Sequence, residues 1–267
     1  MVLQTDLTPR FEVRPLEAKD VPVASAILSH TNIFHSPMWS VAHPDDQTKR
    51  CYDSYKSVDY LVSAAIASQL SYAVYDKEYQ FKRPASAATD GALCWDDTNL
   101  TATSQQLLDE IDSPIVSICM AYDGFHPLNL SRVTDLFNIL PLFAAMHEHF
   151  HEIDARDAKS WEPTATGQVI MRTGTSTRVD YAGLGLMKLM AHWEMKDAAA
   201  KGFRGINIET LHPAVDKVWM NPPAPFKAER VNIFNMNELT VEKDGEKVVA
   251  APQVDILAGR IYIDLTS

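Results

Sequence analysis

The sequence TSTRVDYAGLGL at residues 175–186 joins a predicted strand to a predicted helix. The strand occupies residues 167–176, and the helix occupies residues 183–201. The first turn of a helix has backbone N–H groups without intrahelical partners and carries the positive end of the helix dipole. Gly183 and Gly185 let an anion approach this backbone closely, because neither has a side chain. The stretch therefore predicts a phosphate-binding turn.

The residues after the turn do not fit two common nucleotide-binding motifs. A Walker loop would need a Gly-Lys-Ser/Thr sequence, and a dinucleotide-binding fold would need a third glycine on the helix. Leu186, Met187 and Lys188 occupy these positions instead. Two glycines separated by one residue also occur in purely structural turns, so the surrounding order of elements decides the interpretation.

The turn resembles the coenzyme A turn of the GNAT superfamily of N-acetyltransferases, whose pattern is Arg/Gln-x-x-Gly-x-Gly/Ala. Tyr181, Gly183 and Gly185 match the Tyr-x-Gly-x-Gly frame that is common in this family. Two positions differ: Ala182 stands where Arg or Gln is usual, and Met187 stands where Gly or Ala is usual. We therefore expect backbone donors, rather than a side chain, to bind the pyrophosphate.

The order of the predicted elements extends the resemblance, which covers residues 11–30 and 167–236. Apolar periodicity predicts further strands at 10–15, 92–96, 114–121, 204–210, 229–236 and 258–265, and helices at 17–30, 47–75, 103–112, 128–155 (interrupted at Pro141) and 213–220. Residues 31–166 form a longer segment than a minimal member of the family needs. We expect an enlarged helical insertion there, within a single domain that spans residues 1–267. The insertion resembles an elaborated branch of the kind seen in fungi.

The resemblance implies an α/β (α+β) fold with a central mixed, mostly antiparallel sheet flanked by helices. The family binds acetyl-CoA as cosubstrate, with the pantetheine arm in a V-shaped split between two parallel strands, here 167–176 and 204–210. The implied coenzyme contacts are Thr177, Arg178, Val179, Ala182, Gly183, Leu184, Gly185, Leu186, His212 and Trp219.

The last two of these residues have alternative interpretations. His212 falls where an Asn often contacts the coenzyme, and it is equally suited to cap the helix that follows at Pro213. Trp219 falls where the family often has a tyrosine that acts as general acid. An indole N–H does not protonate a thiolate, so the sequence identifies no general acid.

Acetyl transfer needs a deprotonated amine, and a carboxylate at the end of a strand is a suitable base. Glu209 lies near the end of the strand at 204–210, and strand alternation decides which face of the sheet it occupies. Asp123 and Tyr122 follow a buried strand and are the next candidates. Their alternative role is structural, as turn residues beside Gly124.

A different chemistry is suggested by the sequence HEHFH at residues 147–151. It fits His-Glu-x-x-His, in which two histidines one helical turn apart bind zinc and the Glu activates water. The candidate third ligands, Asp154, Asp157 and Glu162, have no recognised spacing. We therefore expect no metal, and keep a zinc hydrolase using His147, Glu148 and His151 as an alternative.

Composition narrows the class of partner. The net charge of −11 disfavours phosphate backbones and anionic membranes as partners, and mildly favours cationic substrates. Cys51, Cys94 and Cys119 lack paired spacing, which favours a reduced chain. No long apolar run or signal peptide is evident, so we expect a cytoplasmic protein that binds neither nucleic acid nor membrane.

Taken together, these features predict an acetyl-CoA-dependent N-acetyltransferase that acts by direct transfer on the amine of a small molecule. Besides the zinc hydrolase, a non-catalytic relative that binds an acyl-CoA remains an alternative, because Ala182 and Trp219 replace usual functional side chains. The sequence does not indicate the acceptor or the oligomeric state.

Overall fold

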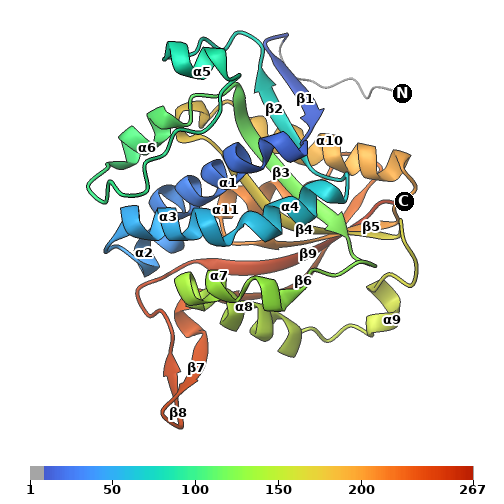
Figure 1. Ribbon diagram of the computed structural model, residues 1–267. Coiled ribbons are helices and arrows are strands. Elements are labelled where there is room, and N and C mark those ends of the chain that lie inside the picture. The colour runs from blue at the N-terminus through green and yellow to red at the C-terminus, as the bar shows by residue number, and fades with distance from the viewer. Residues whose placement is uncertain (1–8, 267) are drawn as a thin grey trace.

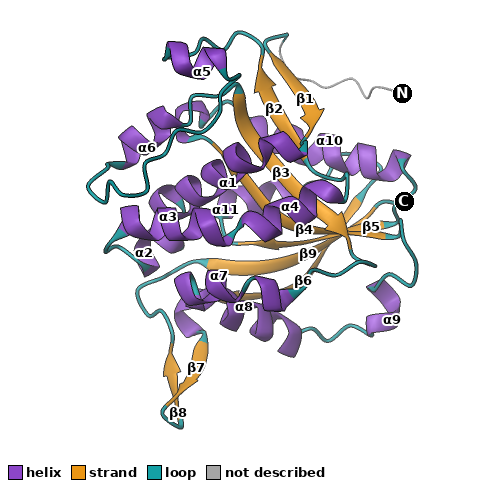
Figure 2. Cartoon of the chain, viewed as in Figure 1, coloured by secondary structure: helices purple, strands orange, loops and turns teal. Residues whose placement is uncertain are grey.

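A seven-stranded sheet forms the centre of the computed structural model, which describes residues 9–266 (Figures 1 and 2). In spatial order its strands are β1 (Phe11–Pro15), β2 (Tyr72–Asp76), β3 (Ile115–Asp123), β4 (Val169–Thr177), β5 (Gly205–Thr210), β9 (Leu257–Asp264) and β6 (Lys227–Asn235). Neighbouring strands are antiparallel, except that β4 and β5 are parallel. This arrangement confirms the predicted mixed, mostly antiparallel sheet.

Helices cover both faces of the sheet. The α-helices are α1 (Val21–His30), α2 (Trp39–Ala42), α3 (Gln47–Ser57), α4 (Asp59–Ala67), α5 (Pro84–Ala88), α6 (Ser104–Glu110), α7 (Thr134–Ile139), α8 (Pro141–Glu152), α9 (Ala158–Trp161), α10 (Leu186–Ala200) and α11 (Pro213–Trp219). Figure 1 shows α1, α3 and α4 on one face and α10 and α11 on the other. A hairpin of β7 (Thr240–Lys243) and β8 (Glu246–Val249) projects from the body. Within residues 9–266, no helix has the length and apolar character needed to cross a membrane.

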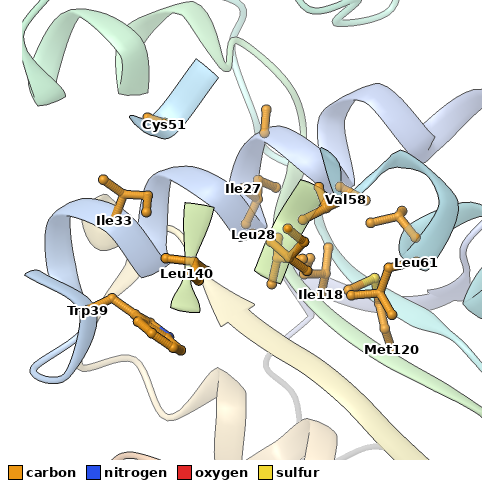
Figure 3. Packing of buried hydrophobic residues seen from close by; sticks show 14 of the residues in the cluster. Ile27, Leu28, Ile33, Trp39, Cys51, Val58, Leu61, Ile118, Met120 and Leu140 are labelled. Atoms are coloured by element: carbon orange, nitrogen blue, oxygen red, sulfur yellow. The ribbon is translucent and has the colours of Figure 1, made fainter. Parts of the chain in front are cut away.

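The larger core lies between the sheet and the helices α1, α3 and α4 (Figure 3). Ile27 and Leu28 of α1 pack with Ile118 and Met120 of β3, and these four side chains are at most 6% exposed. Burying each aliphatic side chain of this size stabilises the fold by roughly 1.5–3 kcal/mol. The same cluster includes Leu142, Met146 and Phe150 of α8, which are four residues apart and therefore share one side of that helix. This packing fixes α8 against the sheet.

The predicted helix at 47–75 is wrong at its C-terminal end. The segment forms α3 and α4, after which Gln69 adopts a left-handed backbone conformation with φ of 60°. The chain then enters β2, which pairs with β1 on one side and with β3 on the other. The sequence YAVYD is rich in aromatic and β-branched residues, so two ladders of backbone hydrogen bonds override the apparent helical spacing.

The strand predicted at 92–96 is also wrong, because this segment is a loop without ladder partners. Its apolar side chains still have a structural role: Leu93 and Trp95 pack against the core, and the Trp95 indole N–H donates to the Leu107 carbonyl at 2.9 Å. Apolar residues that anchor a loop produce the same local pattern as a short buried strand.

A buried ion pair joins the opposite face of the sheet to α10. The Arg172 guanidinium of β4 lies 2.8 Å from the Glu194 carboxylate of α10, and both side chains are only 2% exposed. Arg172 also donates to the Met120 carbonyl at 2.9 Å and to Cys119 Sγ at 3.0 Å. A buried pair of this kind tolerates the loss of one partner poorly, because the remaining charge is left without compensation.

We predict that Glu194→Gln lowers the free energy of unfolding by about 3–5 kcal/mol, because it leaves the Arg172 charge buried and unpaired. Urea denaturation measures this change. The matched control is Glu12→Gln, which breaks the exposed pair of Glu12 with Arg14 and is expected to cost at most about 1 kcal/mol. Equal effects of the two substitutions would contradict the assignment.

Candidate functional site

The two parallel strands separate shortly after they begin to pair. β4 and β5 are partners only at Val169–Met171 and Gly205–Asn207, although β4 continues to Thr177 and β5 to Thr210. On its other side β4 pairs with β3 along most of its length. A register shift between Met120 and Ala121 of β3 leaves Thr173 of β4 without a partner, and such bulges bend a strand away from its neighbour. The result is a V-shaped split that widens toward the C-terminal ends of β4 and β5.

Polar groups at the base of the split lack partners. Asn207, in the last pair before the strands separate, is 3% exposed, and its side-chain Oδ1 has no hydrogen-bond partner within residues 9–266. The same holds for Nε of Arg172 and for Nε1 of Trp219, whose ring lies 5.6 Å from the Arg172 guanidinium. Buried polar atoms normally have partners. Arg172 and Trp219 lie on the α10 side of the sheet and Asn207 on the opposite side, so buried polar atoms without partners occur on both faces at this point.

The turn after β4 is fixed by residues on its inner side. The Arg178 N–H donates to the Val116 carbonyl, and the Arg178 carbonyl accepts from the Tyr181 N–H, both at 2.9 Å. The buried Arg178 guanidinium pairs with Asp180 at 2.7 Å, and the Tyr181 hydroxyl donates to Asp76 at 2.7 Å. These contacts hold the turn rigidly against the sheet.

The outer side of the turn is open. Gly183 and Gly185 have φ of 78° and 75°, a left-handed conformation that glycine adopts without strain. A Cβ atom built on either residue would meet no atom within 4 Å, so the space beyond this backbone is free. Leu186 begins α10, whose first N–H groups point out of the helix without intrahelical partners. The turn therefore presents positive backbone dipoles to a free space.

The predicted coenzyme contacts fall into two groups around this turn. Val179, Ala182, Gly183, Leu184 and Gly185 are exposed. Thr177, Arg178 and Leu186 contact the protein itself: the Thr177 hydroxyl lies 2.8 Å from that of Ser117, and the other two side chains are at most 2% exposed. The buried members can influence a ligand only through the position of the backbone.

The two predicted contacts on α11 lie on the α10 face of the sheet. His212 Nδ1 accepts from the Ala214 N–H at 3.0 Å, so this histidine caps α11 as its alternative interpretation requires. Trp219 is 1% exposed and packs with Ile206, Ile208 and residues of α10. Strand alternation then places Asn207 and Glu209 on the other face of β5, toward α1 and α8.

Glu209 lies two residues beyond the last pair of β4 and β5 and has two strong partners. Its carboxylate accepts from the Arg260 guanidinium of β9 at 2.7 Å and contacts His147 Nδ1 of α8 at 2.9 Å. Burial opposes ionisation of this carboxyl, but the charges and hydrogen bonds of His147 and Arg260 outweigh it, so the pKa of Glu209 is lowered. Glu209 is thus an ionised carboxylate at the edge of the split.

Tyr122 and Asp123 have different environments. Tyr122 is half-buried, and burial together with the Glu209 charge raises its pKa to about 12, so it keeps its proton at neutral pH. Asp123 accepts from the N–H groups of Gly167 at 2.7 Å and Phe125 at 3.0 Å. Asp123 therefore shapes the turn at the closed end of the strand pair, as its structural alternative requires, and the structure does not bring it to the split.

The HEHFH segment occupies the C-terminal half of α8. His147 is directed to Glu209, whereas Glu148 and His151 are exposed. Within residues 9–266, no three His, Cys, Asp or Glu side chains are grouped so that they could bind a metal ion. The first histidine of the motif, His147, therefore contacts Glu209 and is not paired with His151.

Sequence reasoning missed Arg260 and the placement of His147. Arg260 is 2% exposed and contacts the Phe150 carbonyl, Asp154 and Glu209 at 3.1, 3.2 and 2.7 Å. The sequence LAGRIYID contains a single cation in a strand with six apolar or glycine residues, and a buried cation needs an anionic partner. That pattern indicates a charged cluster but does not identify its other members.

Comparisons with known proteins show the fold. No protein-family model matches the chain, and no curated protein matches it in sequence. Among solved structures, the C-terminal condensation domain of Ebony in complex with beta-alanyl-dopamine has a TM-score of 0.60 at 15% identity, covering 94% of this chain and 97% of that chain. Arylalkylamine N-acetyltransferase 2 from Aedes aegypti has a TM-score of 0.57 at 11% identity, covering 96% and 99%. An agmatine N-acetyltransferase has a TM-score of 0.53 at 10% identity, also covering 96% and 99%. The chain therefore has the GNAT fold, as its turn suggested.

Acid should weaken the cluster that holds Arg260. Hydrogen bonds from Arg156 lower the pKa of Asp154 to about 2, and its side chain is 9% exposed. A carboxyl whose pKa is lowered in the folded state stabilises the fold at pH values above its pKa in the unfolded chain, which is near 4. This contribution of about 2 kcal/mol is lost as the pH falls toward 2, the pKa in the folded state. We predict that Asp154→Asn lowers the free energy of unfolding at pH 7 and reduces its fall between pH 4 and pH 2.

Urea denaturation across this pH range checks the prediction. The control is Asp45→Asn at an exposed loop position, which should leave the pH dependence unchanged. An identical loss of stability in wild type and Asp154→Asn would show that the Asp154 carboxylate does not support the cluster.

Proposed function

We propose that this protein transfers an acetyl group from acetyl-CoA to the amine of a small molecule. The observation that supports this most directly is the combination of the strand split with an open glycine turn at the start of α10. The split lies between an anion-binding turn and an ionised carboxylate, which are the two features that a bound thioester and a reacting amine require. We also propose that residues 1–267 form one domain, in which the long segment 31–166 contributes β2 and β3 to the common sheet.

The residues at the split fit the coenzyme. Gly183 and Gly185 have free space above their backbone, and the first turn of α10 supplies N–H donors for the pyrophosphate. Beyond Met171, β4 has an edge without a strand partner on its β5 side, which offers backbone groups to the amides of the pantetheine arm. Ala182 adds no charge, so this binding would depend on the conformation of the backbone.

The reaction by direct transfer would proceed as follows. The acceptor binds as an ammonium ion and loses one proton to a base. Its nitrogen attacks the thioester carbonyl, the new C–N bond forms, and the C–S bond breaks as the thiolate leaves. The second proton of the nitrogen passes to the thiolate, so one proton is released overall. Glu209 and its partner His147 lie on the face opposite α10 and α11, and we propose that the acceptor enters on this side.

The acceptor is proposed to be a cationic amine. The net charge of −11 favours a cation over an anion. Two of the similar structures are named for arylalkylamine and agmatine substrates, and a third contains beta-alanyl-dopamine. Because one of these proteins is a condensation domain, the fold alone does not fix the acyl donor, and acetyl-CoA has to be tested directly.

Calorimetry with acetyl-CoA tests the proposed binding site. We predict that Gly183→Ala weakens acetyl-CoA binding roughly tenfold, because its methyl group enters the space in front of the anion-binding backbone and disturbs a charged hydrogen bond. The substitution should also lower the free energy of unfolding by about 1 kcal/mol, because alanine is strained at the left-handed φ of 78° that Gly183 adopts.

Gly202→Ala is the matched control, because Gly202 has φ of 90° and open space at the other end of α10. It should lower stability by a similar amount while leaving the affinity unchanged. Absence of any binding heat with millimolar acetyl-CoA and the wild-type protein would refute the proposal. Binding without thiol release across a panel of arylalkylamines, agmatine and polyamines would instead favour the non-catalytic alternative.

A further inference from the structure

His147, the first histidine of the HEHFH segment, contacts Glu209 at the edge of the split. His147 Nδ1 lies 2.9 Å from one oxygen of Glu209, and the other oxygen accepts from Arg260 at 2.7 Å. Both carboxylate oxygens therefore have strong partners. A carboxylate that is paired with a buried guanidinium, and whose pKa is lowered, is a weak proton acceptor.

The same contact determines which nitrogen of His147 is available. An ionised carboxylate can only accept a hydrogen bond, so Nδ1 must carry the proton that lies between the two groups. In the neutral ring, Nε2 then has a free lone pair. The His147 side chain is 38% exposed, compared with 16% for Glu209, so the imidazole is the more accessible of the two groups. The His147 ring is thus held in one orientation, has a free acceptor nitrogen at Nε2, and is the more exposed member of the pair.

The surroundings of His147 hold the ring in place. The Phe143 ring packs edge-to-face against it with the centroids 4.5 Å apart, one helical turn away on α8. The Glu209 carboxylate of β5 contacts His147 directly. Arg260 of β9 and Tyr122 of β3 lie around that carboxylate, with Asp154 behind Arg260 and Tyr60 of α4 near Tyr122. On its own helix, Glu148 and His151 are exposed. Glu209 is the carboxylate in direct contact with His147, so it would stabilise an imidazolium.

We propose that His147 is the catalytic base of the amine transfer and that Glu209 is a positioning residue. This inference rests on the proposed acetyltransferase function. His147 Nε2 takes the first proton of the bound ammonium ion, and the resulting imidazolium is balanced by the Glu209 carboxylate. The partly exposed ring then returns this proton to solvent. Arg260 keeps Glu209 ionised and fixed in direction, so that Nδ1 keeps its proton.

The experiment compares pH profiles of kcat/KM for thiol release with the best amine of the panel. The wild-type rate should fall at acid pH, because a protonated imidazole cannot accept a proton. His147→Gln should lower kcat about 100-fold, lose this acid limb and keep the affinity for acetyl-CoA. Glu209→Gln should lower kcat about tenfold and keep an acid limb, because His147 is still present as the base but is no longer held in position.

The opposite pattern overturns the inference. If Glu209 itself were the base, Glu209→Gln would lose the acid limb and His147→Gln would keep it. His151→Gln is the matched control one helical turn away, and its activity should equal that of wild type. A loss of activity in His151→Gln together with sensitivity to a chelator would support a metal site and contradict the inference.

Two further measurements separate the causes of failure. If wild type releases no thiol with any amine, the proposed function fails, whereas an active wild type with an unchanged His147→Gln refutes only the role of His147. Removal of the His147 ring also removes its contacts with Phe143 and Glu209, so urea denaturation and acetyl-CoA binding are measured for each variant. Restoration of the rate of His147→Ala by added imidazole supports the inference, and a folded His147→Ala that imidazole does not rescue contradicts it.

Discussion

The separation of β4 from β5 is the constraint on which the rest of this structure depends. β4 remains paired with β3 along most of its length, but it pairs with β5 over only three residues. The bulge at Thr173 absorbs the change of direction. Both strands lie near the middle of the sheet, so the split opens inside a well-packed molecule, and the helices on each face determine what can reach it from either side.

Buried arginines stabilise the two sides of this opening. Arg172 connects β4 to Glu194 of α10 on one face, and Arg260 connects β9 to Glu209 and Asp154 on the other. Guanidinium groups suit such positions because they stay charged and make several hydrogen bonds in one plane. The opening in the sheet is thus held by charge pairs on both faces, and the Glu209 pair also orients His147, a side chain that can exchange protons.

The sequence predicted the elements next to the split well, because their signals are local. The glycine turn, α10 and β5 follow from periodicity and from residues that break helices, and their predicted bounds lie within three residues of the observed ones. The strand β2 was missed because its aromatic residues continue the apolar spacing of α4, and only its pairing with β1 and β3 identifies it. Likewise, no local sequence pattern around His147 indicates that its partner is Glu209, which lies 62 positions later in the chain. The same five residues fit a zinc motif until the long-range contact is known.

Ala182 has a consequence for how the site tolerates change. The proposed anion site consists of backbone donors, so it would depend on the two glycines and on the placement of the helix, and it would leave the neighbouring side chains free to vary. Substitutions at the exposed positions 179, 182 and 184 would alter the surface of the turn without removing a donor. Such a turn can keep its shape over long evolutionary separation, even when little of its side-chain pattern survives.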